Sequence, residues 1–524
     1  MNILDLPNEL LIIIFNKLNA VDSLYSLVDV NERFDEIVLE ALHIQCLDTA
    51  NMLKESSFDE SAPVNQAILR KICEKILPRL HLQLNELVVD QNSLQHILFS
   101  NTYPQLSSLS LVNFQQKSLL RYLRDDSILR ELLSEQITHL SIGFRFELAV
   151  EDLETSTNIF ALILYLCQRL DSLSYCQLFS YQTIPVFIQI SPSINVISST
   201  LTALAINIKT FQCCLRILDG RFACLRTLRV HIERISHRFC NIDTTSLLPK
   251  LKYFSLISLK ETWWYEKAIV PLIRRMINLE DLSLLFTLCT TSSTFIDGTQ
   301  LHNDILMYLI QLKRFTFSIR TSICDDARKF RLPSNEDIQR SFKGNLYYQV
   351  GSYVDTESLY PTGSCHIYSL PYGFQYFPWL ENRFPGGMFD KVRYLSMFGW
   401  SSFQLILFKR ISESFAYINE LHIHNRGPQI VNEHDLTLII FPHLMLLDLV
   451  YAHVDYAKQF LLHEKISVPS LTDLRITYES LVTVTDNFTN IVARSACSKI
   501  KTLQTDELFV RSEEFYHYFP LIEC

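Results

Sequence analysis

The sequence predicts an α/β protein in which a small helical N-terminal domain precedes a long solenoid of strand–helix repeats. Apolar residues recur at helical spacing through roughly the first forty residues. A short apolar motif then returns at near-regular intervals from residue 84 onward. That rhythm fails between 318 and 391, where aromatic residues and glycines gather. We therefore expect parallel strands on a concave face, helices on a convex face, and a β-rich insertion at 318–391.

The repeated motif is an apolar residue, two variable residues, an apolar residue, one variable residue and a last apolar residue, as in Leu84-Leu87-Val89. Its second half alternates with period two, which predicts a short strand with one buried face. The residues between copies are helix-like. Outside the gap, successive copies start 22 to 33 residues apart. Thirteen copies start at Leu84, Leu106, Ile137, Leu170, Leu201, Leu225, Leu251, Leu279, Leu312, Val392, Ile418, Leu444 and Leu471.

This pattern resembles leucine-rich repeats, whose units bury their apolar faces only by stacking on their neighbours. In that family, Asn or Cys usually stands three residues after the motif and ladders the backbone. Here only the first copy keeps it, at Asn92, while later copies place residues such as Arg145, Arg320 and Glu479 there. The resemblance therefore implies a divergent repeat array. The sequence supports the presence of the array more firmly than it defines the curvature of the solenoid.

The variable positions of each strand are expected to face the concave side, where solenoids generally bind their partners. Both charge signs occur there, together with aromatic side chains. Taken singly, such residues are more often solvated than functional, whereas as a set they mark the face where solenoids bind. The candidate substrate-binding residues are Arg229, Tyr253, Arg314, Tyr394, His422, Asp448 and Arg475.

The N-terminal segment predicts a helical hairpin with more large apolar residues than it can bury. Leu10, Leu11, Ile14 and Phe15 mark one helical stripe, and a second stripe resumes at Leu24 after a break at 19–22. A module this short buries only part of its apolar surface alone. A cover must come from the remaining chain or from another protein.

The hairpin also resembles the F-box family. The residues that match the family pattern are Leu6, Pro7, Glu9, Leu10, Leu11, Ile14, Phe15, Leu18, Asp22, Leu24, Val30, Arg33 and Phe34. Ser23 is inserted, and Asn31 stands where Cys is frequent. The resemblance implies a partner, the S-phase kinase-associated adaptor protein, and through it a cullin. The implied adaptor-binding residues are Leu6, Pro7, Glu9, Leu10, Leu11, Ile14, Phe15, Leu18, Leu24, Val30 and Phe34. The alternative is an ordinary hairpin packed on its own domain.

Composition excludes several classes of partner. Net charge is −9 and no Lys/Arg run exceeds two residues, which disfavours nucleic acid. No apolar stretch is long enough to span a membrane, and the run from Leu10 to Phe15 is too short for a secretory leader. The thirteen cysteines show neither metal-ligand spacing nor a disulfide framework. We expect a cytoplasmic or nuclear protein without cofactor or metal.

The interrupted stretch favours strands at 346–354 and 365–370, bounded by glycines. Its aromatic residues are either the core of an irregular repeat or a protrusion that contacts substrate. The pair Cys365-His366 lacks a third partner near it in sequence. The sequence contains no Gly-rich phosphate loop and no nucleophile elbow. We therefore expect a non-catalytic chain, with an enzyme centred on Cys365 and His366 as a minor alternative.

These observations predict an F-box domain at 1–45 and a helical linker or cap at 46–80. The solenoid follows at 81–317, the insertion at 318–391, and the second solenoid part with its C-terminal cap at 392–524. The expected function is substrate recognition in a cullin-type ubiquitin ligase. The alternative is a repeat scaffold that binds the adaptor or other proteins without ligase activity.

Overall fold

The structure is a computed structural model. It describes residues 3–15, 17, 20–41, 44–50, 66–125, 127–145, 153–175, 187–190, 197–236, 246–291, 294–324, 332–342, 349–355, 363–429, 438–462 and 465–522. The predicted site residue Leu18 lies outside these ranges. The chain forms two compact units, Met1–Glu233 with Lys250–Phe254, and Arg234–Pro249 with Ser255–Cys524.

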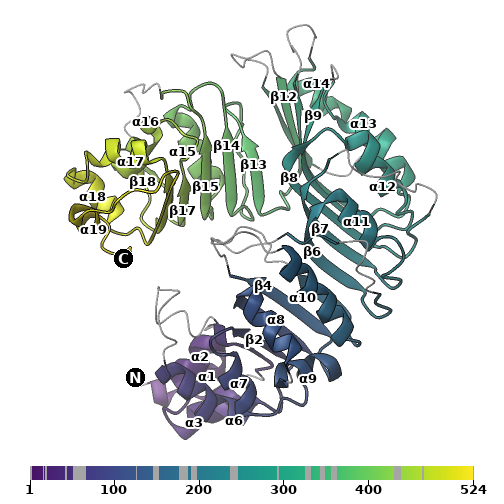
Figure 1. The fold of residues 1–524 in the computed structure, drawn as a ribbon, viewed down its shortest axis with the longest axis vertical. Coiled ribbons are helices and arrows are strands. Elements are labelled where there is room, and N and C mark those ends of the chain that lie inside the picture. Colours follow the sequence, from purple (N-terminus) through teal and green to yellow (C-terminus); the bar gives the residue numbers. More distant parts are fainter. Residues whose placement is uncertain are drawn as a thin grey trace. The chain divides into compact units, whose positions relative to one another are not determined.

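The first unit begins with helices and continues with alternating strands and helices (Figure 1). Its N-terminal helices are η1 (Ile3–Asp5), α1 (Asn8–Phe15), α2 (Ala20–Leu27), α3 (Glu32–Glu36) and η2 (Ile37–Ala41). Its later helices are α5 (Gln66–Lys71), η3 (Ile72–Ile76), α6 (Leu77–Leu80), α7 (Leu94–Ser100), α8 (Gln116–Arg124), α9 (Ile128–Glu135), α10 (Leu153–Leu166) and α11 (Phe211–Ile217). Its strands are β1 (Cys46–Asp48), β2 (Glu86–Asp90), β3 (Ser108–Phe114), β4 (His139–Phe144), β5 (Ser172–Tyr175), β6 (Ala203–Thr210) and β7 (Thr227–Arg234).

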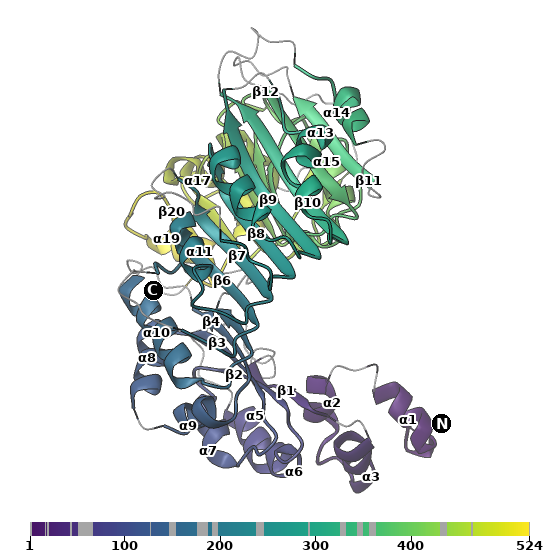
Figure 2. The ribbon, with the colours of Figure 1, turned by 90° about the vertical axis from the view of Figure 1, so that its right-hand side faces the viewer.

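Strands β1 to β7 lie side by side in chain order. Strands β1 to β6 pair in parallel, with Leu87, Leu109, Leu140, Leu173 and Leu204 in one lateral row. All five leucines are buried. Figure 2 shows α7 to α10 grouped along one side of β2 to β4. The apolar row is therefore the seam on which each repeat packs against the next.

The second unit contains the remaining elements. Its strands are β8 (Tyr253–Thr262), β9 (Asp281–Thr290), β10 (Arg314–Ile323), β11 (Gln349–Asp355), β12 (Gly363–Leu370), β13 (Tyr376–Leu380), β14 (Tyr394–Phe398), β15 (Glu420–His424), β16 (Ile439–Ile440), β17 (Leu446–Asp448), β18 (Ile466–Ser467), β19 (Asp473–Ile476) and β20 (Thr502–Thr505). Its helices are η4 (Tyr265–Ile269), α12 (Val270–Arg274), α13 (Gly298–Asp304), η5 (Leu306–Tyr308), α14 (Asn335–Ser341), α15 (Leu405–Ser414), α16 (Val454–Leu461), α17 (Tyr478–Thr485), α18 (Ile491–Cys497) and α19 (Glu513–Tyr518).

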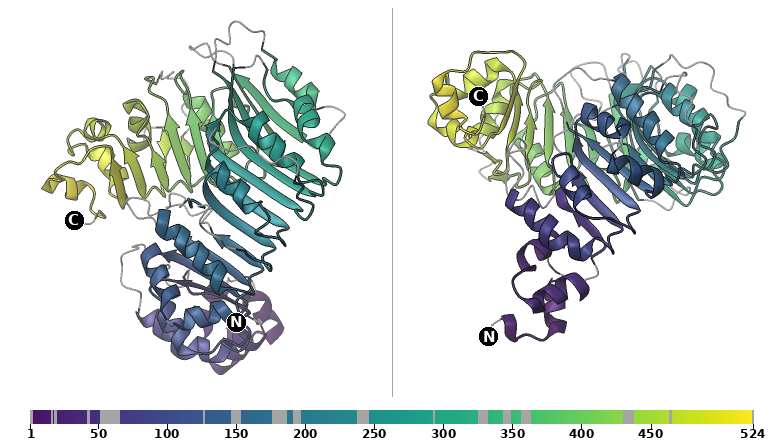
Figure 3. Two further views of the ribbon diagram at one scale, coloured as in Figure 1. Left: turned by 45° about the vertical axis from the view of Figure 1, so that its right-hand side comes forward. Right: turned by 60° about the horizontal axis from the view of Figure 1, so that its bottom comes forward.

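The described strands of this unit lie in three sheets, of which the smallest is the parallel pair β16 and β18. Strands β8, β9, β10, β12 and β11 are neighbours in that order. Strand β9 pairs in parallel with β10, whereas β12 is antiparallel to both β10 and β11. The second sheet runs β13-β14-β15-β17-β19-β20, and all its pairs are parallel (Figure 3). Each of the thirteen motif copies contains a strand, which confirms the predicted strand positions. The mixed α/β architecture is consistent with a repeat solenoid.

The segment where the repeat fails supplies β11, β12 and β13. Many of its aromatic side chains are buried rather than displayed, including Tyr353, Tyr368, Tyr372, Phe377 and Phe384. They belong to the same core cluster as Leu285 of β9 and Leu395 of β14. This favours the interpretation of these rings as core. Tyr347, Tyr348 and Tyr360 lie outside the described residues.

No helix in the described part of the chain is long and apolar enough to cross a membrane.

Candidate functional site

The N-terminal hairpin divides its apolar residues between an interior and an exterior. Leu11, Phe15, Leu24 and Phe34 are buried, and the rings of Phe15 and Phe34 meet edge to face at 5.3 Å between centroids. The family resemblance implies an adaptor-binding role for all four, whereas in this structure they are buried in the hairpin's own core, which packs α1, α2 and α3 together.

The opposite face of the hairpin leaves large apolar side chains in solvent. Leu10, Ile13, Ile14 and Val30 are 45%, 56%, 40% and 58% exposed. The helical repeat explains the split, since Leu11 and Phe15 are four residues apart and share one face, while Leu10 and Ile14 share the next. Pro7 and Glu9 are also exposed, and Leu6 is half-buried. We call Leu10, Ile13, Ile14 and Val30 the exposed stripe. Exposed apolar side chains grouped on one helix, as Leu10, Ile13 and Ile14 are on α1, are typical of interaction sites.

Arg33 fixes the position of the opening segment. Its Nε donates to Asn8 Oδ1 at 2.7 Å and its Nη1 to the Leu4 carbonyl at 2.7 Å, and Nη2 donates to the Leu6 carbonyl. The inserted residue Ser23 is buried and donates its hydroxyl to the Phe15 carbonyl at 3.3 Å. Both side chains thus order the backbone that carries the exposed stripe.

The hairpin is attached to the rest of the first unit by polar contacts. Arg79 of α6 pairs with Asp35 of α3, and Lys75 Nζ lies 3.6 Å from Asp29 Oδ2. Figure 2 shows α1 projecting away from the strands of this unit. Leu10, Ile13 and Ile14 of the exposed stripe lie on α1 and Val30 lies in the turn before α3, and the described residues around them leave all four side chains exposed.

Four of the predicted substrate-binding residues meet on the second sheet. Tyr394 is on β14, His422 on β15, Asp448 on β17 and Arg475 on β19. His422, Asp448 and Arg475 occupy one register row. His422 Nδ1 lies 3.2 Å from Asp448 Oδ2, Arg475 Nη1 lies 3.6 Å from the same oxygen, and the Tyr394 and His422 rings are 4.6 Å apart. We call these four residues the strand-face row.

The electrostatics of the strand-face row follow from burial and pairing. Burial alone would lower the pKa of His422, but hydrogen bonds to Asp448 and Glu420 outweigh it and raise the pKa above its usual value. Burial would raise the pKa of Asp448, yet the His422 contact and a backbone N–H bring it below its usual value. The row therefore favours an imidazolium held between carboxylates, with Arg475 beside it.

The other three predicted residues are not part of the strand-face row. Arg229 is exposed on β7, and Tyr253 is exposed at the start of β8. Arg314 is exposed at the start of β10 and its Nε lies 2.8 Å from Asp281 Oδ2 on β9. They stay separate surface positions, with no shared geometry that favours one ligand.

Cys365 and His366 lie in the interior of β12, and both side chains are enclosed by the described residues around them. Both are buried, His366 Nε2 is 2.9 Å from Ser318 Oγ, and its Nδ1 is 3.1 Å from the Tyr353 hydroxyl. Burial, together with the charge of Arg320, lowers the pKa of His366 to about 3. Burial raises the pKa of the Cys365 thiol. A neutral imidazole and a protonated thiol suit a packed core.

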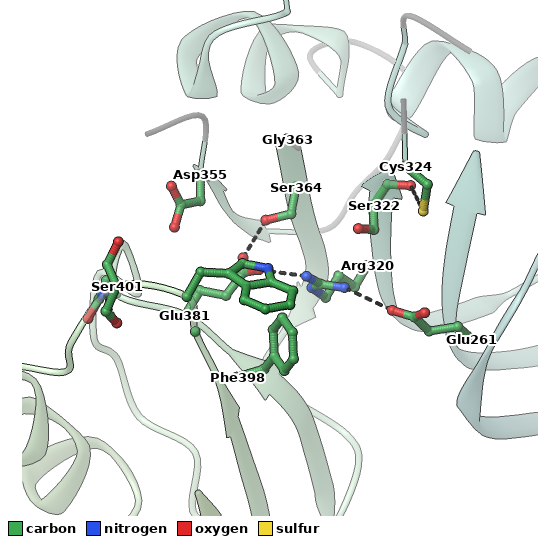
Figure 4. A pocket seen from close by; sticks show the side chains of 13 residues that line it. Glu261, Arg320, Ser322, Cys324, Asp355, Gly363, Ser364, Glu381, Phe398 and Ser401 are labelled. Atoms are coloured by element: carbon green, nitrogen blue, oxygen red, sulfur yellow. Dashed lines mark hydrogen bonds and ion pairs between the residues drawn. The ribbon is translucent and has the colours of Figure 1, made fainter. Parts of the chain in front are cut away.

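A pocket in the second unit was not foreseen from the sequence (Figure 4). Its volume is about 250 Å³, and β8, β10, β11, β12, β14 and the segment that follows β13 contribute to its wall. The lining residues are Glu261, Arg320, Ser322, Cys324, Asp355, Gly363, Ser364, Glu381, Asn382, Phe398, Gly399, Trp400 and Ser401. The only sequence signal was Arg320, which stands where leucine-rich repeats usually carry Asn. Among the described residues, no cluster of His, Cys, Asp and Glu is arranged to hold a metal ion.

Comparisons with known proteins add little to this description of the sites. No protein-family model matches the sequence, and no curated protein matches it. Among solved structures, one titled "Crystal structure of Rad7 and Elc1 complex in yeast" aligns at 11% identity with a TM-score of 0.33. That alignment covers 84% of this chain and 92% of that chain. A likeness this distant carries no conclusion about function, so the functional argument rests on the sites described above.

Proposed function

We propose that this chain is a non-catalytic substrate receptor of a cullin-type ubiquitin ligase. The N-terminal hairpin binds the S-phase kinase-associated adaptor protein, and through it a cullin. The strand face of the repeats binds a protein substrate. The proposed location is the cytoplasm or the nucleus.

One observation supports this proposal most directly, namely the exposed stripe of Leu10, Ile13, Ile14 and Val30. These side chains project from a hairpin whose interior is already filled by Leu11, Phe15, Leu24 and Phe34. The stripe is therefore not needed for the hairpin's own core. Transfer of such groups from water into an interface is favourable by about 25 cal/mol per Å² of apolar surface. A partner of standard interface size would bury roughly 1,600 Å² in total.

The mechanism is positional. A receptor that holds substrate at a fixed reach from a ubiquitin-loaded enzyme converts an encounter between two molecules into an intramolecular one. The strand-face row offers both charge signs and an aromatic ring for such a contact. No nucleophile or acid–base pair on this chain is required for that role.

The test is adaptor binding by surface variants. Ile14→Asp or Leu10→Asp would bury a carboxylate at an apolar contact, so we expect the affinity for the adaptor to fall at least about tenfold. Binding is measured by titration of the purified adaptor. Ile310→Asp is the matched control, because Ile310 is 82% exposed and lies in the second unit. Circular dichroism verifies that all three variants stay folded. Undiminished affinity of both hairpin variants contradicts the proposal.

The second candidate is a repeat scaffold that binds the adaptor without delivering substrates. The exposed stripe favours it equally, because the stripe concerns adaptor binding alone. Reconstitution with adaptor, cullin and ubiquitin-conjugating enzyme separates the two. Ubiquitin transfer to proteins captured by the repeats supports the receptor, whereas a stable complex without transfer supports the scaffold.

A further inference from the structure

The pocket of the second unit contains a buried guanidinium whose hydrogen bonds are incomplete. Arg320 is 3% exposed, and its Nη2 donates to Glu381 Oε1 at 2.6 Å. Its Nε and Nη1 have no hydrogen-bond partner among the described residues, although Nη1 lies 3.7 Å from Glu261 Oε1. Buried donors are nearly always satisfied, so unpaired ones at a pocket wall point to an absent acceptor.

The charges around Arg320 are unequal. Three carboxylates, those of Glu261, Asp355 and Glu381, line the pocket with one guanidinium. Glu381 also accepts from the Ser364 hydroxyl, so it is engaged on both oxygens. Burial raises the pKa of Asp355, and the positive charge of Arg383, which does not line the pocket, opposes that rise. Glu261 remains partly exposed, with its Oε2 accepting from Cys289 Sγ at 3.2 Å. Excess negative charge in a concave site attracts cations and repels anions.

Aromatic rings complete the wall. Phe398 and Trp400 line the pocket, and the ring of Trp379 lies 5.8 Å from Arg320 Cζ. Trp379 has φ of 59°, a left-handed backbone conformation that bulky residues rarely adopt. Two hydrogen bonds hold Trp379 in this conformation. Its backbone N–H donates to Ser396 Oγ at 2.9 Å, and its indole N–H donates to the Leu259 carbonyl at 3.3 Å. Carboxylates beside aromatic rings are surroundings that favour a basic side chain.

We propose that this pocket binds a basic side chain, Lys or Arg, from an extended segment of a protein partner. The cationic group lies between Glu261 and Asp355 against the aromatic wall. A main-chain carbonyl of the same segment accepts from Nε or Nη1 of Arg320, which lack a hydrogen-bond partner among the described residues. A peptide supplies both the cation and the acceptor, which a free inorganic anion does not.

This inference rests on the proposed function in one respect, since it names the class of substrate segment that a receptor would take. Its test needs no adaptor. Loss of adaptor binding in the hairpin variants and loss of peptide binding at the pocket are therefore separate results.

The experiment titrates the full chain with capped tripeptides and follows tryptophan fluorescence. All four tryptophans are in the second unit, and Trp400 lines the pocket. The probes are acetyl-Gly-Arg-Gly-amide, its Lys counterpart, a citrulline counterpart that keeps shape without charge, and a Glu counterpart. We expect saturable binding of the Arg or Lys peptide, about tenfold tighter than the citrulline peptide. Preference for Arg over Lys would indicate a planar, bidentate contact.

Variants decide whether the signal comes from the pocket. Glu261→Gln and Asp355→Asn keep side-chain shape, and each should weaken the basic peptide about tenfold or more while leaving the citrulline peptide unchanged. Glu413→Gln, at an exposed position of α15, removes the same charge elsewhere and should change neither. Equal binding of Arg and citrulline peptides, preference for the Glu peptide, absence of saturable binding, or insensitivity to both variants overturns the proposal.

Discussion

Arg33 shows how one side chain can hold a short segment in place. Its guanidinium joins α3 to Leu4, Leu6 and Asn8, on the backbone that leads into α1. A planar fork with several N–H donors can reach three acceptors at once, whereas an ammonium group concentrates its charge at one point. The orientation of the exposed stripe therefore depends on a residue that is not itself apolar.

Replacing Arg33 tests that dependence. We expect Arg33→Lys to loosen the start of α1, at a cost of about 1 kcal/mol because the guanidinium is only partly buried. Faster amide hydrogen exchange in α1 and weaker adaptor binding are the expected results. Arg70→Lys is the control, since Arg70 is exposed and forms an exposed ion pair with Glu74 at 3.9 Å. Unchanged exchange in α1 would show that the hairpin core alone fixes the helix.

His422 makes the strand-face row sensitive to pH. The groups around it are Tyr394, Asp448, Arg475 and, on its own strand, Glu420 and His424. Because its pKa is higher in the folded state, the fold favours the protonated ring. That stabilisation is complete below the unfolded pKa of about 6.5 and is lost as pH rises through the higher folded pKa.

We therefore expect the second unit to unfold at a lower urea concentration at pH 8.5 than at pH 6. This drop in the unfolding midpoint should be larger than the drop in a variant whose residue 422 cannot titrate. Tryptophan fluorescence follows the transition. His422→Gln is that variant, since it retains hydrogen bonding and lacks the charge. Identical pH dependence of the two proteins would show that His422 does not titrate as its surroundings indicate.

At the scale of elements, β11 and β12 are held by close packing at a glycine. A Cβ at Gly351 would lie 2.2 Å from Tyr368 Cε2, which is far inside van der Waals contact. Tyr368 is buried among other rings and cannot move aside easily. The aromatic core of this segment therefore requires glycine at that position of the strand.

We expect Gly351→Ala to destabilise the second unit by about 1–3 kcal/mol through overpacking. Urea denaturation followed by tryptophan fluorescence measures the change. Gln349→Ala lies on the same strand at an exposed position and is the control. An equal transition midpoint for both variants would mean that the Tyr368 ring has room to rotate.

The sequence predicted some structural features of this chain better than others. Leu84-Leu87-Val89 and its later copies predicted strands correctly, because a period-two pattern reports one buried face directly. The division of α1 into inner Leu11 and outer Leu10 was not predicted, since both fit the same apolar pattern. Choosing between them requires knowing which face meets α3. The pocket was hidden for another reason, since Arg320 and Glu381 are 61 residues apart in sequence.

At the scale of the whole molecule, the two compact units carry different optical signals. Trp263, Trp264, Trp379 and Trp400 are the four tryptophans, and all belong to the second unit. Circular dichroism reports helices and strands of both. A chain of this kind need not unfold in one step.

We expect core substitutions to separate these signals. Leu447→Ala empties a fully buried position of β17 and should lower the fluorescence midpoint, at a cost of about 2–5 kcal/mol. Leu109→Ala does the same in β3 of the first unit, so it should lower the dichroism midpoint and leave the fluorescence midpoint nearly unchanged. Parallel shifts in both signals for both variants would show that the chain unfolds as a single cooperative block.

The eight residues of α1 have a further consequence for how this protein can change. Each residue advances a helix by about 100°. Inserting a single residue after Asn8 would swing every later side chain around the axis, turning Ile14 toward Phe34 and exposing Phe15. Point substitutions on the outer face leave the inner face intact, but a frame-preserving codon insertion disturbs both at once. Homologous chains should therefore tolerate amino-acid substitutions in α1 far more readily than insertions or deletions.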